Sequence, residues 1–290
     1  MKIDLHSHTR CSDGTLTPAE LVQRAHTMQV DVLAITDHDT VAGIESAMAA
    51  QAQTKRPLRI VPGVELSTSW HGFDIHVLGL EVAHNDDRFL QRLETQSQRR
   101  QTRAQKMADK LAKAGIEGVY EAARQLAGDG QITRAHFARA LVSMGAVKDM
   151  DSAFKKYLGK GKRAHVKPEW ITIEQATTWI HEAGGQAVLA HPGHYDMTTK
   201  WLRRLVAEFA EAGGDGMEVV HSHLSPAKQQ LLIDMALEHG LKGSAGSDFH
   251  FPNRWTELGR NLSISDSLTP IWQAWPWGQA LQQLMAGNTQ

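Results

Sequence analysis

The sequence predicts an α/β barrel of about seven strands that carries a helical insertion. Short runs rich in Val, Ile and Leu alternate with amphipathic stretches of helical period, which is typical of parallel strands joined by crossover helices. Histidine and carboxylate side chains follow several of these runs, at the strand ends where barrel proteins carry their active sites. Between residues 85 and 161 the alternation stops and helical stretches follow one another. We therefore expect a barrel interrupted by one helical segment.

The first two predicted strands deliver histidines to one rim. Residues 2–5 alternate polar with apolar, so residues two apart share a face, and His6 and His8 leave this strand side by side. Residues 32–36 are apolar and β-branched, as in a buried parallel strand, and His38 follows their carboxyl end. A single histidine at such a place is most often structural, but each further donor at a strand end favours a metal site.

Later segments carry further donors in the same pattern. Four of them are residues 58–65, 73–79, 187–193 and 243–250. Together with a loop aspartate, nine side chains qualify as ligands: His6, His8, Asp13, His38, Glu65, His76, His191, Asp248 and His250. Because one zinc ion takes about four ligands, this set predicts two or three divalent ions.

Helix signals lie between the strands. Thr17 to Glu20 is a capping box with proline at the first helical position, Thr172 to Gln175 repeats the box, and Ser225-Pro226 opens a further helix. In the insertion we predict helices over residues 86–114, 117–127, 133–144 and 149–158. The expected domains are a discontinuous barrel over residues 1–90 and 165–290 and an inserted basic helical subdomain over residues 91–164.

Charge is unevenly divided along a chain whose formal net charge is −1. Residues 88–167 hold 18 Lys and Arg against 7 Asp and Glu, while the rest of the chain holds 13 against 25. A basic surface concentrates and steers polyanions, which indicates a phosphate-bearing substrate. For Arg92, Arg99, Arg103 and Lys106, on one long predicted helix, a solvated helical face is an equal alternative.

Composition sets the broad class. The 290 residues can bury a large core, and 41% hydrophobic with 22% charged residues is typical of a globular protein. No apolar run reaches the roughly 18 residues of a membrane span, and the amino terminus does not read as a signal peptide. The single cysteine, Cys11, fits a reducing compartment. We expect a cytoplasmic protein without membrane contact, and no obligate protein partner is indicated.

The motifs resemble those of the PHP (polymerase and histidinol phosphatase) superfamily of metal-dependent phosphoesterases. The matching segments are Asp4-Leu5-His6-Ser7-His8, Thr36-Asp37-His38, Gly63-Val64-Glu65, His191-Pro192 and Ser247-Asp248-Phe249-His250. The resemblance implies a distorted, TIM-like (β/α)7 barrel. It also implies a ligand set: His6, His8, Glu65 and Asp248 for one ion, Glu65, His76 and His191 for a second, and Asp13, His38 and His250 for a third.

Within the superfamily the chain is similar to the 3′,5′-nucleoside bisphosphate phosphatases and 5′-3′ exoribonucleases, which share the stretch that here runs from Arg134 to Arg139. The resemblance implies removal of the 3′-phosphate from substrates such as adenosine 3′,5′-bisphosphate, and hydrolysis of short RNA. A hydroxide bridging two ions held by Glu65 is the expected nucleophile. Mixed imidazole and carboxylate ligands suit manganese, iron or zinc better than magnesium, and the resemblance favours manganese.

Basic and imidazole side chains are the candidates for contacting the substrate. Arg134 is expected to hold a phosphate through its planar guanidinium, and His194 to act as an acid or phosphate contact. With Glu65, these two are the candidate catalytic residues. Further binding candidates are His136, Lys160, Lys162, Arg163, His165, His221 and His223. For the four between 160 and 165 a plain basic linker is equally open. Three carboxylates are expected to accept the second ring N–H of the ligating histidines: Asp4, Asp37 and Asp39.

Two other functions stay open. One is a histidinol-phosphate phosphatase or other small phosphomonoesterase of the same superfamily, and the basic insertion counts against it. The other is a non-catalytic metal-binding module, and the presence of all nine ligand positions counts against it.

Overall fold

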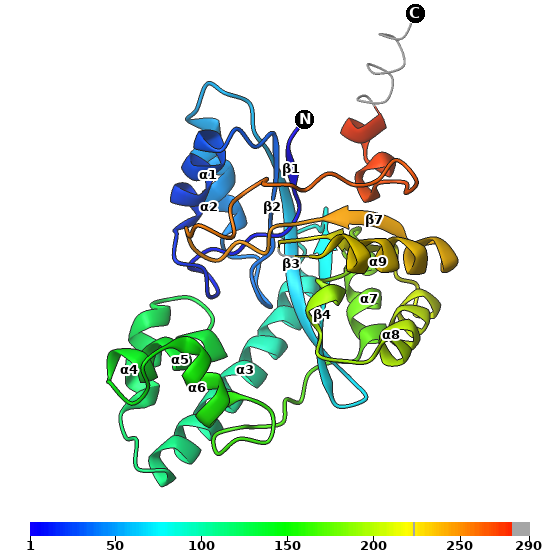
Figure 1. Cartoon of the computed structure of the whole chain (residues 1–290). Coiled ribbons are helices and arrows are strands. Elements are labelled where there is room, and N and C mark those ends of the chain that lie inside the picture. The colour runs from blue at the N-terminus through cyan, green and yellow to red at the C-terminus, as the bar shows by residue number, and fades with distance from the viewer. Residues whose placement is uncertain (223, 280–290) are drawn as a thin grey trace, which may run out of the picture.

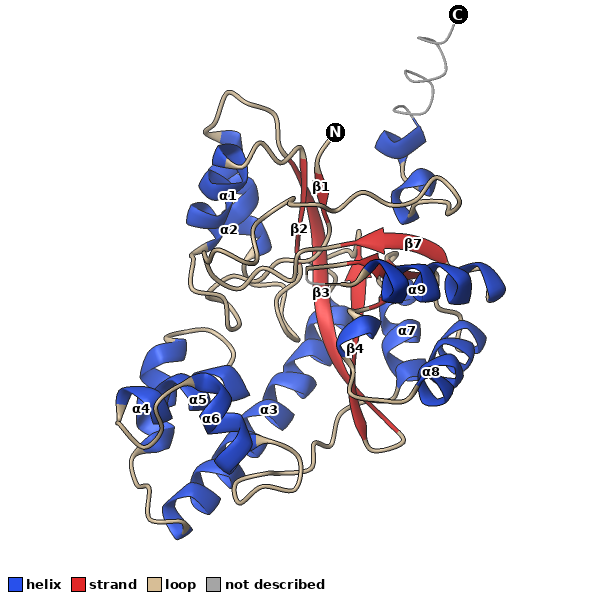
Figure 2. Cartoon of the chain, in the orientation of Figure 1, coloured by secondary structure: helices blue, strands red, loops and turns tan. Residues whose placement is uncertain are grey.

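The computed structural model describes residues 1–222 and 224–279, with strands at the centre and helices around them (Figure 2). The strands form one seven-stranded sheet in chain order. Their bounds are β1 (Ile3–Asp4), β2 (Val32–Ile35), β3 (Arg59–Trp70), β4 (Phe73–Leu80), β5 (Gln186–Leu189), β6 (Gly216–Val220) and β7 (Lys242–Ala245).

Most neighbouring strands pair in parallel, but β4 runs antiparallel to both β3 and β5. The reason is a two-residue turn after β3. His71 (φ +44°) and Gly72 (φ +81°) both lie in the left-handed region, which produces a tight hairpin instead of a crossover helix. β4 is therefore the exception to the expected parallel pairing, and β3 continues past Glu65, where the strand was expected to end, to Trp70.

Backbone hydrogen bonds bring the two ends of the sheet together. The amide of Leu5 donates to the carbonyl of Ala245 at 3.0 Å, and the amide of His8 donates to the carbonyl of Phe249 at 2.8 Å. Ser7 and Phe249 also form a parallel bridge. The result is a nearly closed barrel in which the segments after β1 and β7 meet at one rim. The predicted seven-stranded α/β barrel is confirmed.

The helices surround the sheet and extend to one side of it (Figure 1). They are α1 (Pro18–Thr27), α2 (Ile44–Ala52), α3 (Asp87–Lys113), α4 (Val119–Ala127), α5 (Arg134–Ser143), α6 (Met150–Ala153), α7 (Ile173–Glu182), α8 (Thr199–Glu211) and α9 (Pro226–Glu238), with a π-helical turn η1 (Phe154–Leu158) and 3₁₀ turns η2 (Pro192–His194) and η3 (Ile271–Ala274). The predicted capping boxes at Thr17 and Thr172 are present, and Ser225 caps α9. None of the helices within the described residues is long and apolar enough to cross a lipid bilayer.

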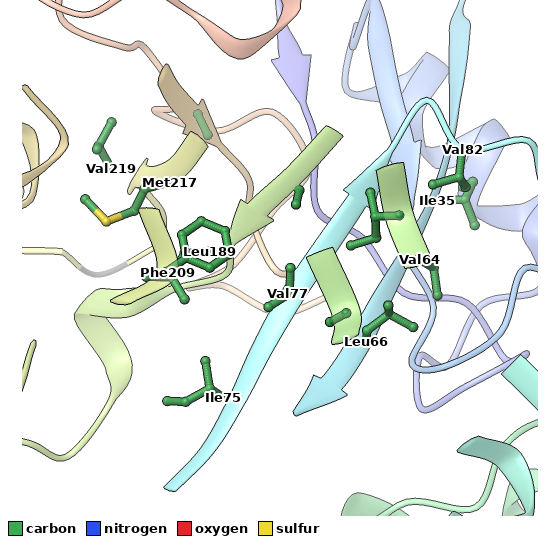
Figure 3. Packing of buried hydrophobic residues seen from close by; sticks show 14 of the residues in the cluster. Ile35, Val64, Leu66, Ile75, Val77, Val82, Leu189, Phe209, Met217 and Val219 are labelled. Atoms are coloured by element: carbon green, nitrogen blue, oxygen red, sulfur yellow. The ribbon is translucent and has the colours of Figure 1, made fainter. Parts of the chain in front are cut away.

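Both faces of the sheet are buried. Leu66 and Val77 pair in the register of β3 and β4 and lie in the main core with Phe209 of α8 and Met217 of β6 (Figure 3). Leu78, which points to the opposite face, belongs to a second cluster. Strands buried on both faces have a strongly specified register, so the residues at their ends are held in fixed positions.

The long helix α3 connects the barrel to the helical insertion. Near its start, Phe89 and Leu93 pack in the main core of the barrel. From Ala104 onward its buried side chains belong to a separate apolar cluster with residues of α4, α5 and η1. The insertion therefore has a core of its own and lies beside the barrel (Figure 1). α3 crosses the boundary expected at residue 91, and the division into two domains stays a prediction.

Candidate metal centre

The nine predicted donors meet at one rim of the barrel. His6 and His8 lie on either side of Ser7, whose bridge to the segment after β7 holds both rings at this rim. His191 follows β5 and Asp248 follows β7, with φ values of +32° and +53°. Left-handed backbone is strained for residues that carry a side chain, and such strain gathers at functional sites where the surrounding structure holds it in place.

Glu65 lies at the centre of this donor cluster and is 1% exposed. Its Oε1 is 2.8 Å from Nδ1 of His76 and 2.9 Å from Nε2 of His191. Its Oε2 lies within 3.4 Å of a ring nitrogen of three further histidines, His6, His8 and His38. Each carboxylate oxygen therefore faces a different set of imidazoles, which is the arrangement of a bridging ligand.

Donor atoms within 4.8 Å of one another form three overlapping groups. They are His6, His8 and Asp248; His38, Glu65 and His76; and His8, Asp13, His38 and His250. The grouping differs from the implied ion sites: Glu65 is not in the group of His6, His8 and Asp248, and His191 is in none of the three. In addition His8 and His38, each expected at one ion only, belong to two groups. Nδ1 of His38 is 2.9 Å from Oε2 of Glu65, and its Nε2 is 3.7 Å from Oδ2 of Asp13. His38 thus lies between two groups, and the assignment of ligands to ions stays a prediction.

The donor chemistry fits divalent metal ions. Asp13 Oδ1, Glu65 Oε2, His38 Nδ1 and His191 Nδ1 are buried without a hydrogen-bond partner among residues 1–222 and 224–279. Glu65 Oε2 and His38 Nδ1 are close together but lack the alignment of a hydrogen bond. An unpaired buried polar group costs about 1–3 kcal/mol. Cations coordinated by Asp13 Oδ1, Glu65 Oε2 and His38 Nδ1 would remove that cost for these three atoms, whereas His191 faces the cluster through its other ring nitrogen, Nε2. Mixed nitrogen and oxygen donors suit divalent ions of the first transition series.

The ionisation of the carboxyl groups in the cluster also favours bound cations. Burial raises the pKa of a carboxyl group, but the imidazole of His38 and its neighbours hold the pKa of Glu65 well below its usual range. The pKa values of Asp13 and Asp248 are also lowered well below theirs by nearby imidazoles, against the effect of burial. Burial lowers the pKa of His8, yet the neighbouring carboxylates of Asp248 and Glu65 outweigh it and raise that pKa to about 10. Ionised carboxylates in a buried site require positive charge beside them.

Glu218, in the middle of β6, was not among the predicted site residues. Its side chain is fully buried, and its carboxylate oxygens lie 3.1 and 3.2 Å from Nδ1 of His6. The carboxylate also accepts a 2.6 Å hydrogen bond from the amide of His191. A proton held on Nδ1 of His6 leaves Nε2 free to ligate, so Glu218 orients a ligand. The available signal was a glutamate within the apolar run 217–220, since buried glutamates are almost always paired.

The three aspartates expected to accept a ring N–H from a ligand make other contacts. Asp4 accepts hydrogen bonds from backbone amides. Asp37 accepts one from the hydroxyl of Ser12, and Asp39 pairs with Arg100 at 2.6 Å. These carboxylates therefore hold the loops that carry the ligands, while Glu218 alone of the described carboxylates outside the donor set contacts a ligating ring.

A basic cavity of about 160 Å³, which we name the arginine hollow, opens beside the donor cluster. Its lining includes Asp13, His38 and His76 of the cluster, Asp74 of β4, and Arg100, Arg103 and Arg134 of α3 and α5. Arg103 and Arg134 share Asp74, at 3.6 and 3.4 Å. Burial, followed by the charge of Arg134, lowers the pKa of Arg103 to about 10. Because these two guanidinium groups share a single carboxylate, an excess of positive charge remains in the hollow beside the donor cluster.

Other binding candidates lie elsewhere. His136 is buried at the start of α5, where its Nδ1 accepts from the amide of Thr133 as part of a capping box. Lys160 donates to the carbonyl of Gly72 at the hairpin turn and lies over the ring of Phe73. Among the described residues, the lining of the arginine hollow does not include the basic return segment of Lys160, Lys162, Arg163 and His165.

Two predicted histidines lie next to His191. The rings of His194 and His221 are 4.1 Å apart between centroids, and the ring of His194 is 6.1 Å from that of His191. His194 is exposed, whereas His221 is buried and its Nε2 has no hydrogen-bond partner within the part of the chain that the structure describes. Burial lowers the pKa of His221 to about 4. The predicted binding residue His223 lies outside the described residues.

The fold is a nearly closed barrel, and imidazoles and carboxylates gather at one rim of it. These two features indicate a class of protein, the barrels that hold a metal centre at the ends of their strands. The chain belongs to the PHP domain family, whose model matches residues 4–180. The predicted membership is confirmed.

Relatives with known names cover nearly the whole chain. It is 49% identical, over 96% of its length and 95% of the relative's, to the 5′-3′ exoribonuclease Rnm of Salmonella typhimurium. It is 42% identical, over 93% of each chain, to the 3′,5′-nucleoside bisphosphate phosphatase of Chromobacterium violaceum. A solved structure described as an amidohydrolase from Chromobacterium violaceum matches with a TM-score of 0.88 and 40% identity, over 94% of this chain and 95% of that one.

Proposed function

We propose that this protein is a metal-dependent phosphoesterase that removes the 3′-phosphate of nucleoside 3′,5′-bisphosphates and hydrolyses short RNA from its 5′ end. One observation carries the proposal: Asp13, His38 and His76 belong to the donor cluster and also line the arginine hollow. A nucleotide with two phosphates can therefore place one at the cluster and the other at the guanidinium groups. The names of the relatives support both activities.

The chain's own residues bind and orient this substrate. Arg134 is half-buried and offers two parallel N–H donors to the 5′-phosphate, in place of its contact with Asp74. Arg103, which shares Asp74, adds a second guanidinium to the same phosphate site. At the other end, Glu65 aligns the imidazoles of the cluster around the 3′-phosphate. His194, exposed beside His191, is the candidate donor of the proton that the leaving 3′-oxygen requires.

The metal ions are part of the proposal. When bound, two or three divalent ions neutralise the phosphoryl oxygens and make water acidic enough to attack at neutral pH. Manganese is the proposed ion, with iron or zinc as alternatives, because the donor set mixes imidazole with carboxylate.

The two activities break the same bond, between phosphorus and the 3′-oxygen of the first nucleotide. In a bisphosphate the phosphorus that water attacks belongs to a terminal phosphate, and in RNA this phosphorus carries the next nucleotide. The same contacts to the 5′-phosphate therefore serve both substrates. The cytoplasmic location expected from the sequence stays a prediction.

A substrate comparison tests the proposal. Purified protein with manganese is assayed on adenosine 3′,5′-bisphosphate, on 3′-AMP, which lacks the 5′-phosphate, and on histidinol phosphate. We expect kcat/KM to be at least about tenfold higher for the bisphosphate than for 3′-AMP, because a charge-assisted contact to the 5′-phosphate is lost. A Glu65→Gln preparation controls for contaminating phosphatases. Preference for histidinol phosphate would overturn the proposal.

A further inference from the structure

A second basic cavity, which we name the outer groove, shares Arg103 with the arginine hollow, and its lining includes none of the nine donors. It has a volume of about 200 Å³, and its lining includes Arg99, Thr102, Arg103, Lys106, Lys167 and Glu169. These residues come from α3 and from the segment that returns from the insertion to the barrel. The cavity has room for one or two phosphoryl groups.

Arg103 connects the outer groove to the arginine hollow. One terminal nitrogen of its guanidinium is 3.6 Å from Oδ2 of Asp74, in the wall of the hollow. Its Nε donates at 3.2 Å to the carbonyl of Val166, in the wall of the groove. The guanidinium also lies over the ring of Trp170, 5.3 Å from its centroid, and this contact fixes its plane. Arg103 therefore lines both cavities, and a phosphate held by Arg103 and Arg134 is next to a residue of the outer groove.

The groove carries an excess of positive charge. Of its cations, Lys106 pairs with the one lining carboxylate, Glu169, at 3.6 Å. Arg99 and Lys167 have no carboxylate within ion-pair distance among the described residues, and Arg99 contacts the amide oxygen of Gln96 instead. By contrast Arg92, on the same helix, pairs with Glu182. Unpaired cations that line a cavity create a local electric field that attracts anions. The cavity distinguishes these residues from a solvated helical face, the alternative interpretation of the same cations.

We infer that the outer groove binds phosphoryl groups attached to the 5′-phosphate, so that the enzyme accepts nucleoside 3′-phosphates and RNA ends carrying a 5′-diphosphate or 5′-triphosphate. The inference rests on the proposed function, which places the 5′-phosphate at Arg134 and the 3′-phosphate at the donor cluster. A chain that continues beyond the 5′-phosphate then passes Arg103 into the groove. The reaction is unchanged: water adds across the bond between the 3′-oxygen and phosphorus, and the 5′ phosphoanhydride bonds stay intact.

Steady-state kinetics on two substrates test the inference. Adenosine 3′-phosphate 5′-triphosphate and adenosine 3′,5′-bisphosphate are compared at one free metal concentration, with wild type and the double variant Lys106→Ala/Lys167→Ala. The matched control, Lys55→Ala/Lys113→Ala, removes two exposed lysines outside the groove. We expect the groove variant to raise KM for the triphosphate about tenfold and to leave the bisphosphate unchanged. The control should match wild type on both substrates, and thermal unfolding checks that all proteins are folded.

Several results would overturn the inference. The groove variant could keep the wild-type KM for the triphosphate, or wild type could hydrolyse the bisphosphate and not the triphosphate. An equal rise in KM on both substrates would assign the two lysines to a general attraction of anions. In each of these cases hydrolysis of the bisphosphate by wild type leaves the proposed function standing. Failure of wild type on both substrates would instead remove the proposed function itself.

Discussion

The replacement Glu218→Gln tests whether a buried carboxylate orients the ligand His6. Glu218 accepts hydrogen bonds from the Nδ1–H of His6 and from the amide of His191, and its side chain is fully buried. Glutamine keeps the shape but replaces one carboxylate oxygen by an NH₂ group. If its oxygen stays with His191, the NH₂ faces Nδ1–H of His6. This opposition of two donors, 3.1 Å apart, favours moving the proton of His6 to Nε2, the atom that faces the donor cluster.

The size of the effect follows from these contacts. A hydrogen bond to a charged group contributes about 1.5–3 kcal/mol. Since each 1.4 kcal/mol is a factor of ten, the loss weakens metal binding roughly 10- to 150-fold. This range agrees with the roughly 10- to 100-fold losses typical of changes to groups that support a ligand. The variant should weaken the binding only of ions that contact His6. A saturating metal concentration should therefore restore the full number of bound ions.

The assay is a metal titration. Metal-stripped wild type and Glu218→Gln are titrated with manganese against a chelating indicator, which measures the dissociation constant without reference to turnover. The control is Glu238→Gln, which removes a carboxylate from an exposed pair with Arg203 and should leave the constant unchanged. A folded Glu218→Gln variant that binds manganese as tightly as wild type would refute the role assigned to Glu218.

Three further predictions concern the ligands, the phosphate contact and the insertion. His38→Ala should lower the number of bound ions, measured by elemental analysis, and reduce kcat by more than the roughly 10- to 100-fold expected for a supporting group; full metal content with unchanged turnover would contradict this. Arg134→Ala should raise KM for adenosine 3′,5′-bisphosphate roughly tenfold or more, from about 1.5–3 kcal/mol of lost binding, and an unaltered KM would exclude it as the phosphate contact. Burial lowers the pKa of His136 from 6.5 to about 4, so the folded state binds fewer protons than the unfolded state, and stability present above pH 6.5 is lost as the pH falls towards 4. His136→Gln keeps a capping box with Thr133 and removes this titration, so between pH 7.5 and pH 5 wild type should lose about 2 kcal/mol more stability than the variant in urea unfolding; equal losses would show that His136 does not stay neutral in the fold.

Local patterns were enough to predict most of the barrel rim. His6 and His8 are two residues apart at a strand end, so their common direction follows from strand geometry alone. The capping boxes at Thr17 and Thr172 are signals within four residues of sequence, and both are present. The reversal of β4 depends on the backbone of His71 and Gly72, and His71 is not a residue type that marks a hairpin turn by itself.

Features that depend on distant residues could not be predicted. Glu218 contacts His6 across most of the length of the chain, and no spacing rule connects them. The arginines of α3 looked alike in the sequence, yet the structure pairs Arg92 with Glu182, buries Arg100 against Asp39 and leaves others to line cavities. These differences arise from which face of α3 the barrel covers, and only tertiary packing decides that.

The most direct measurement for the central claim is an anomalous difference map from crystals grown with manganese and recorded at its absorption edge. Glu65 presents each of its oxygens to a different set of imidazoles, so the account predicts two or three peaks around it. One peak should lie near His6, His8 and Asp248. A map without peaks in this cluster, from protein that still hydrolyses adenosine 3′,5′-bisphosphate in the presence of a chelator, would contradict the account.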